Sequence, residues 1–186
     1  VLDPKNMPDS QRIKARIEEV LATLTTLPDG TKEQAGATYK LAENARQADK
    51  VKEAEQLYTQ VIEAAEQLGK TREWGFVSDS YSRRGAIRVG QGRWDEAIED
   101  FVKATVLEPS SAASWSWVGT SLSRVENTAL RHRVIQTIAA IEVERGSQST
   151  FHGQALALYE AAKWVEDPSA KRPLLHNALV AIDKAL

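Results

Sequence analysis

The chain has no cysteine among its 186 residues. Disulfide bonds, thiolate nucleophiles and cysteine-based zinc or iron–sulfur sites are therefore excluded. The absence of cysteine leaves the cellular compartment open.

Neither sign of charge dominates the composition. Lysine and arginine number 24 against 26 aspartates and glutamates, for a net charge of -2, and both signs are interspersed along the chain. No field of one sign therefore draws the protein to nucleic acid or to an anionic membrane. Apolar runs are only a few residues long, so no segment is expected to span a bilayer. We expect a soluble protein, cytoplasmic or organellar.

Side chains with the spacing of a catalytic or metal site are also missing. The histidines His132, His152 and His176 are far apart, so a metal site built from them would need coincidence in the fold. The glycines at 85, 90 and 92 lack the Lys-Ser/Thr of a phosphate-binding loop. We therefore predict no catalytic residues, no metal and no cofactor, and a function other than enzymatic.

What the chain does contain is a helical hairpin between Tyr81 and Pro109. Gly85 gives the first helix a small face, and the segment 90–92 (Gly-Gln-Gly) breaks it. On the second helix, small and aromatic residues recur at spacings of four and three, and Pro109 ends the pair. These positions are Ala97, Phe101 and Ala104.

In residue type and spacing this hairpin resembles the 34-residue tetratricopeptide repeat (TPR). The matching positions are Tyr81, Gly85, Ala97, Phe101, Ala104 and Pro109, with Trp94 in the turn. The hairpin departs from the family at Arg84, where Leu is usual, and at Arg88, where Tyr is usual. We expect Arg84 to pair with Asp100 across the hairpin, which would explain a charge at a usually apolar position.

The same pattern returns elsewhere along the chain. Ala42, Ala54, Tyr58 and Val61 precede Gly85, Ala97, Phe101 and Ala104 by a constant 43 residues. Trp115 and Gly119 follow Tyr81 and Gly85 by 34 residues. We expect about four repeats, at approximately 31–68, 71–109, 111–145 and 148–186. The last two are degenerate: Arg131 replaces the small residue of the third, so that its helices must splay or the side chain turn outward. The fourth loses the signature of its first helix.

The sequence thus predicts an all-α protein, and the resemblance implies antiparallel helical hairpins stacked as a right-handed solenoid. Residues 1–9 are expected to form an extended lead-in, and 10–186 a single repeat domain that begins with an amphipathic helix over 10–27. That helix either packs on the first repeat as a cap or docks on another protein. Because the chain starts at Val1, we expect a removed leader or an incomplete chain.

Residues that typically begin or end helices give further expectations. Gly69 is expected to end a helix, and Thr71 to cap a longer-than-usual following helix that runs through Trp74. Pro173 is expected in the first turn of the last helix. The apolar end of the chain at Leu186 lacks a polar capping helix, so further chain or a partner is expected to cover it.

The resemblance also implies a concave groove, lined by the first helices of successive repeats, that takes an extended peptide or a helix. The residues expected to face it are Tyr39, Glu43, Arg46, Asp79, Ser82, Arg83, Ser116, Trp117, Thr120 and Arg124. Trp117 lies two residues after Trp115, about 200° around the helix. It is therefore expected to contact a partner, or else to pack inside. We expect Tyr39, Arg83 and Trp117 to converge on one surface.

A chaperone carboxylate clamp, used by one TPR subgroup, is not expected here. Its five places carry Tyr39, Glu43, Arg83, Ala113 and Trp117 instead of the lysines, asparagines and arginine of that subgroup. The partner is therefore not predicted to be a chaperone tail.

The function predicted from the sequence is a non-enzymatic scaffold for protein–protein interaction. The alternative is a structural subunit or assembly factor of a larger membrane-associated complex, in a chloroplast or mitochondrion, because Arg84-Gly85 and Asp100-Phe101 resemble a subtype of cyanobacterial and chloroplast repeats. RNA binding is a third hypothesis, from the arginines near Trp94. The acidic residues 95–100 that follow counter it, so no nucleic acid is expected.

Overall fold

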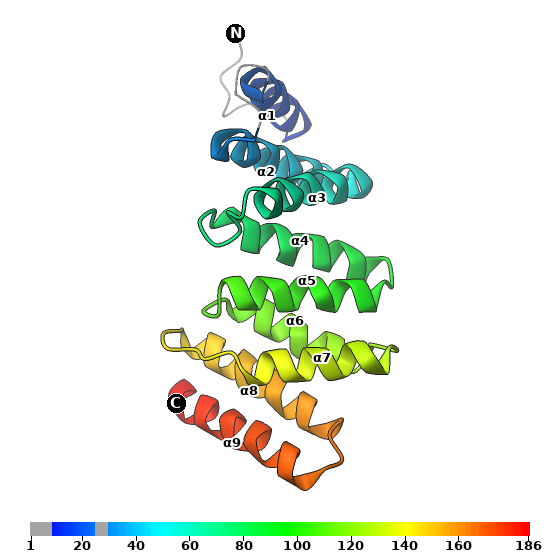
Figure 1. Ribbon diagram of the computed structural model, residues 1–186. Coiled ribbons are helices and arrows are strands. Elements are labelled where there is room, and N and C mark those ends of the chain that lie inside the picture. Colours follow the sequence, from blue (N-terminus) through cyan, green and yellow to red (C-terminus); the bar gives the residue numbers. More distant parts are fainter. Residues whose placement is uncertain (1–8, 25–29) are drawn as a thin grey trace. The chain divides into compact units, whose positions relative to one another are not determined.

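The computed structural model describes residues 9–24 and 30–186, and within these residues it contains helices and no strand (Figure 1). The prediction of an all-α chain of helical hairpins is confirmed. Residues 1–8 of the expected lead-in and residues 25–27 of the expected first helix lie outside the described residues, whereas Asp9, expected in the lead-in, is the first residue of a helix. The helices are α1 (Asp9–Leu24), α2 (Lys32–Gln47), α3 (Val51–Gln67), α4 (Phe76–Gly90), α5 (Trp94–Leu107), α6 (Ala112–Leu122), α7 (Thr128–Ala139), α8 (Gln148–Lys163) and α9 (Pro168–Ala185).

The contacts of the chain group into two compact units, Val1–Arg84 and Gly85–Leu186, with the boundary inside α4. The first unit holds α1, α2, α3 and the start of α4, and the second holds the end of α4 and the helices α5 to α9. A single repeat domain over residues 10–186 stays a prediction.

In the first unit, α2 and α3 form an antiparallel pair (Figure 1). The hydroxyl of Thr31 caps α2 by accepting a hydrogen bond from the backbone N–H of Gln34. Small residues such as Ala42 and Ala54 are fully buried in this unit, beside the larger Tyr58. Because alanine adds little bulk, the two helices can approach closely around one aromatic side chain.

The link between α3 and α4 corrects one expectation. Gly69 ends α3 as predicted: its φ is 64°, and its N–H donates to the carbonyl of Glu66. Thr71, however, lies in a turn and caps no helix, because α4 begins only at Phe76. The extra residues of this repeat form a loop that buries Trp74, whose ring packs 5.9 Å from that of Phe76. Burying an indole outweighs the modest gain of extending a helix.

In the second unit, α6 and α8 cross at nearly backbone contact. A Cβ atom added to Gly119 of α6 would lie 3.3 Å from the Cα of Ala157 in α8. Trp115, on the same helix, is fully buried, and its indole N–H donates to the carbonyl of Pro109 at 2.8 Å. Gly119 and Trp115 therefore fix α6 through two contacts, one with α8 and one with the backbone of Pro109.

The degenerate third repeat accommodates Arg131 by turning its side chain to a new partner. The guanidinium lies 3.8 Å from the ring centre of Trp164, and it donates to the backbone carbonyl of Val125. The side chain is partly buried, and its Nε atom is buried without a hydrogen-bond partner. Stacking a cation on an aromatic face stabilises the arrangement.

The last two helices form an antiparallel pair, α8 and α9 (Figure 1). Asp167-Pro168 separates the two helices, as expected of a proline after a capping residue, and the carboxylate of Asp167 accepts the N–H of Ser169. The last helix nevertheless starts at Pro168, so Pro173 lies inside it and not in its first turn. Pro168 suits the first helical position because its missing N–H is not needed there. The capped break thus starts α9 earlier than expected.

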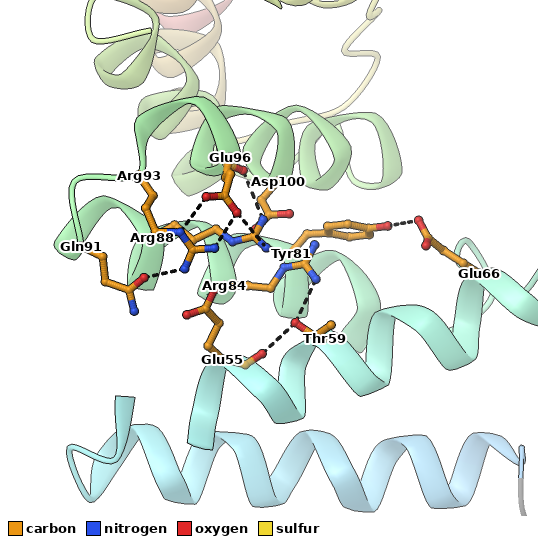
Figure 2. A network of polar contacts seen from close by, with 10 residues as sticks. All are labelled: Glu55, Thr59, Glu66, Tyr81, Arg84, Arg88, Gln91, Arg93, Glu96 and Asp100. Carbon is orange, nitrogen blue, oxygen red and sulfur yellow. Dashed lines mark hydrogen bonds and ion pairs between the residues drawn. The ribbon is translucent and has the colours of Figure 1, made fainter. Parts of the chain in front are cut away.

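Cations on α4 make different contacts within the two units. Arg84 donates to the hydroxyl of Thr59 at 3.1 Å in the first unit. In the second unit, Arg88 donates to the buried carboxylate of Asp100 at 2.8 Å (Figure 2). The Arg84–Asp100 pair expected from the sequence would join the two units and stays a prediction. At Arg88, where the family has tyrosine, the arginine forms an ion pair with a buried carboxylate.

Replacing Gly85 by leucine is expected to destabilise the second unit. In the structure a Cβ atom at Gly85 would lie 2.8 Å from the ring of Phe101. Overpacking this contact should lower the free energy of unfolding by about 1–3 kcal/mol, measured by urea denaturation. Gly90→Leu is the control, because a Cβ atom there meets nothing within 4 Å. Equal losses in the two variants would contradict the close packing of α4 on Phe101.

Candidate partner-binding site

The residues predicted to line the groove are divided between the two units. Six belong to the first unit: Tyr39, Glu43, Arg46, Asp79, Ser82 and Arg83. Four belong to the second unit: Ser116, Trp117, Thr120 and Arg124.

The centre of the first group is the carboxylate of Glu43 on α2. Arg46, one turn along the same helix, donates to it through Nη2 at 2.9 Å and Nε at 3.4 Å. Tyr58 of α3 donates its hydroxyl to Oε1. The Nε atom of Arg83 on α4 lies 3.5 Å from the same oxygen. One carboxylate thus connects three helices.

The pKa of Glu43 reflects this pairing. Burial by itself would raise the pKa of the carboxyl group. Hydrogen bonds from Arg46 and Tyr58, together with the charges of Arg46 and Arg83, outweigh burial and hold the pKa below its ordinary value of 4.5. The hydrogen bond to Glu43 in turn raises the pKa of Arg46. Glu43 is therefore ionised and neutralised by its own chain at physiological pH.

Tyr39 lies beside this carboxylate, half-buried on α2. Its ring stacks on that of Phe76, with centroids 5.8 Å apart. Burial, reinforced by the charges of Asp79 and Glu43, raises the pKa of Tyr39 to about 12, against the effect of Arg83. The phenol is therefore neutral at physiological pH, and its hydroxyl can donate and accept hydrogen bonds.

The structure therefore brings five of the six predicted residues of this unit together. Asp79 and Arg83 lie one turn apart on α4, and both act electrostatically on Tyr39. Ser82, between them on α4, is half-buried. The Arg83 side chain is 47% exposed, so its guanidinium is open to a partner at the edge of the cluster.

A pocket of about 460 Å³ opens beside Glu43 and Tyr39, between α1 and α2. Its lining combines both signs of charge and amides with apolar surface. The residues are Arg16, Glu19, Val20, Ala37, Tyr39, Lys40, Glu43, Asn44 and Gln47. Such a lining suits a segment of polypeptide that carries both polar and apolar side chains.

In the second unit, Trp117 of α6 packs against the core. Its ring is stacked on that of Phe101, with centroids 5.3 Å apart and planes 5° from parallel, and it remains only partly exposed. The inside position was the alternative that the sequence left open. A stacked, partly exposed ring can also offer its edge to a partner.

The other three predicted residues of this unit lie at the surface. Thr120 is exposed and donates its hydroxyl to the carbonyl of Ser116. Ser116, also exposed, lines a pocket between α6, α8 and α9. The guanidinium of Arg124 lies 5.8 Å from the ring centre of Trp94, which is half-buried. The expected convergence of Tyr39, Arg83 and Trp117 crosses both units and stays a prediction.

Sequence reasoning missed the part that Tyr58 plays in this site. Tyr58 was recognised as the signature aromatic of the first repeat, where the next repeat has Phe101. The signal was available, because a tyrosine at a buried position usually needs a partner for its hydroxyl. The contribution of α1 through Arg16 and Glu19 could not be found in this way, because it depends on how α1 packs on α2.

The described residues contain neither a cluster of metal-binding side chains nor a membrane-spanning helix. No group of three or more histidine, aspartate or glutamate side chains is placed to hold a metal ion in residues 9–24 and 30–186. Among the helices that the structure describes, none is both long and apolar enough to cross a membrane.

Glu43→Gln is expected to destabilise the protein at neutral pH and much less in acid. Because the folded-state pKa of Glu43 lies below 4.5, its ionised form stabilises the fold above that pH, and this contribution is lost as the pH falls through the folded-state value. Urea denaturation should give a loss of about 1–2 kcal/mol at pH 7 that shrinks near pH 3. Glu63→Gln, an exposed position on α3, is the control. A loss independent of pH would contradict the proposed pairing.

Trp117→Ala is expected to lower the stability of the second unit, because it removes the ring stacked on Phe101. The loss in free energy of unfolding should be about 3 kcal/mol, at the low end for large aromatic residues since the ring is only partly buried. Trp164→Ala, at a more exposed ring, is a comparison that should cost less. If Trp117→Ala left the melting temperature unchanged, the stacked ring would contribute nothing to the core.

Comparisons with known proteins identify the fold. No family model matches the sequence, and a search of curated proteins finds no match either. The structure is similar to the crystal structure of TPR-like repeats of a kinesin light chain from Podosopora anserina, with a TM-score of 0.56 and 15% identity over 94% of this chain and 89% of that one. A variant of the same repeats gives a TM-score of 0.54 and 16% identity over the same shares of the two chains. The fold of this chain is thus that of TPR-like helical repeats.

Proposed function

We propose that this chain is a non-enzymatic scaffold that binds a segment of a partner protein, peptide or helix, along the predicted groove. TPR-like repeats commonly mediate protein–protein interaction, and that precedent supports a binding role. The observation that carries the proposal is the cluster around Glu43, where an ion-paired carboxylate, a neutral phenol and an exposed guanidinium lie beside an open pocket.

The cluster suits a partner segment that carries an acidic residue between apolar anchors. Arg46 is closer to Glu43 than Arg83 is, at 2.9 Å against 3.5 Å, so Glu43 stays paired when Arg83 turns to a second carboxylate. A guanidinium can hold a carboxylate through two parallel hydrogen bonds. The rings of Tyr39 and Phe76 offer apolar surface next to it for an anchoring side chain.

The second unit carries its own predicted contact residues on α6, namely Ser116, Trp117, Thr120 and Arg124. Trp117 offers a partly exposed ring that is held rigid by stacking on Phe101. A rigid aromatic side chain loses little conformational entropy on binding, so it is an effective contact even when only partly exposed.

The second candidate is a structural subunit or assembly factor of a larger complex. The observation that favours it is the set of large apolar side chains left exposed on α8 and α9, which include Leu156, Tyr159, Trp164 and Leu179. Exposed apolar surface of this kind is typical of proteins that are covered in their working state. Size-exclusion chromatography of native extract separates the two candidates, because a permanent subunit elutes in one large complex and an adaptor does not.

A peptide selection tests the scaffold proposal. A library of random peptides displayed on phage, selected on the full chain, should enrich segments with an acidic residue flanked by apolar ones. Arg83→Glu should then weaken binding of a selected peptide about tenfold or more, since it replaces the attracting charge by a repelling one. Arg72→Glu makes the same change of charge at an exposed position of the α3–α4 loop and should leave binding unchanged. Selected peptides that bind all three chains equally would count against the site.

A further inference from the structure

Helix α9 has two apolar faces, and only one of them is used within its unit. Leu174, Ala178 and Ala181 are buried. Leu175, Leu179 and Ile182 are 37%, 61% and 44% exposed, respectively, and follow each other at spacings of four and three. This spacing keeps them on one side of a helix, in the pattern by which helices pair with one another.

Two charges of opposite sign lie along one edge of this exposed stripe. At about 100° per residue, Arg172 and Asp183 project within roughly 40° of Leu179 and on the same side of it. Arg172 lies toward the start of α9 and Asp183 toward its end, and both are exposed. The edge therefore runs from positive to negative along the helix.

This arrangement is complementary to itself. When two copies of a helix pair antiparallel about a two-fold axis, equal edges face each other and the start of one lies beside the end of the other. Arg172 of one copy then meets Asp183 of the other, twice per pair. The midpoint of the two charges and the midpoint of the stripe from Leu175 to Ile182 lie one residue apart, about 1.5 Å along the axis. One alignment thus satisfies the apolar and the charged contacts together.

We propose that α9 is a self-association surface, on which a second copy of this chain packs antiparallel through Leu175, Leu179 and Ile182. The shared midpoint points to a second copy, because an unrelated helix could match the stripe without any such symmetry on α9. A pocket of about 610 Å³ opens at Ile182, between α9, α8 and α6, and adds concave surface next to the stripe.

Analytical ultracentrifugation of the full chain tests the apolar contact. The wild type should show a concentration-dependent equilibrium between monomer and dimer. Leu179→Asp should weaken dimerisation about a hundredfold, because it places two charges in the centre of the interface. Asn177→Asp adds the same charge to the same helix on another side, at an exposed position, and should change the dimerisation constant less than about threefold.

A charge exchange tests the antiparallel alignment. Arg172→Asp and Asp183→Arg should each weaken the dimer about tenfold, because each replaces two attractions by two repulsions. The double variant should regain most of the wild-type affinity, since the opposite charges face each other again. Circular dichroism should show unchanged helix content in all variants. The proposal is wrong if the wild type stays monomeric up to about 200 µM, if Leu179→Asp and Asn177→Asp behave alike, or if the double variant fails to recover.

Discussion

Close approach of helices is the constraint on which the rest of this structure depends. Two crossings leave room for only a small residue on one side and a ring or a backbone on the other, at Gly85 against Phe101 and at Gly119 against Ala157. Burying a polar group without a hydrogen bond costs free energy. A polar side chain near a crossing is therefore stabilised by a partner on a neighbouring helix, as the hydroxyl of Tyr58 is by Glu43, and such partners shape the surface that remains outside.

The aromatic residue at a crossing contributes to whether the nearby surface is charged or apolar. In the first repeat it is Tyr58, whose hydroxyl needs an acceptor and finds it in Glu43, so that arginines gather around the carboxylate. In the second repeat it is Phe101, which has no polar atom and instead stacks on Trp117. The hydroxyl of Tyr58 thus belongs to a charged cluster in the first repeat, whereas the ring of Phe101 belongs to an apolar stack in the second.

The sequence predicted the parts of the fold that depend on neighbouring residues. Helix ends at Gly69 and Asp167 follow from capping and backbone geometry within a few residues, and both are present. The loop that buries Trp74 was missed because its stability comes from tertiary contact, which no local pattern contains. The site shows the same limit: five of the six residues predicted for the first unit lie near one another in the structure, whereas the role of Tyr58 depends on the packing of α3 on α2.

The two surfaces proposed here differ in what holds a partner. Around Glu43 the charges are already balanced within the chain. A partner carboxylate therefore adds binding free energy only if it pairs with Arg83 more closely than Glu43 does, at 3.5 Å. Such an exchange of ion pairs favours specific and reversible binding. On α9 nothing is exchanged, because burying Leu179 releases water without breaking an existing contact of the chain. A dimer formed through α9 would present two copies of the proposed partner site.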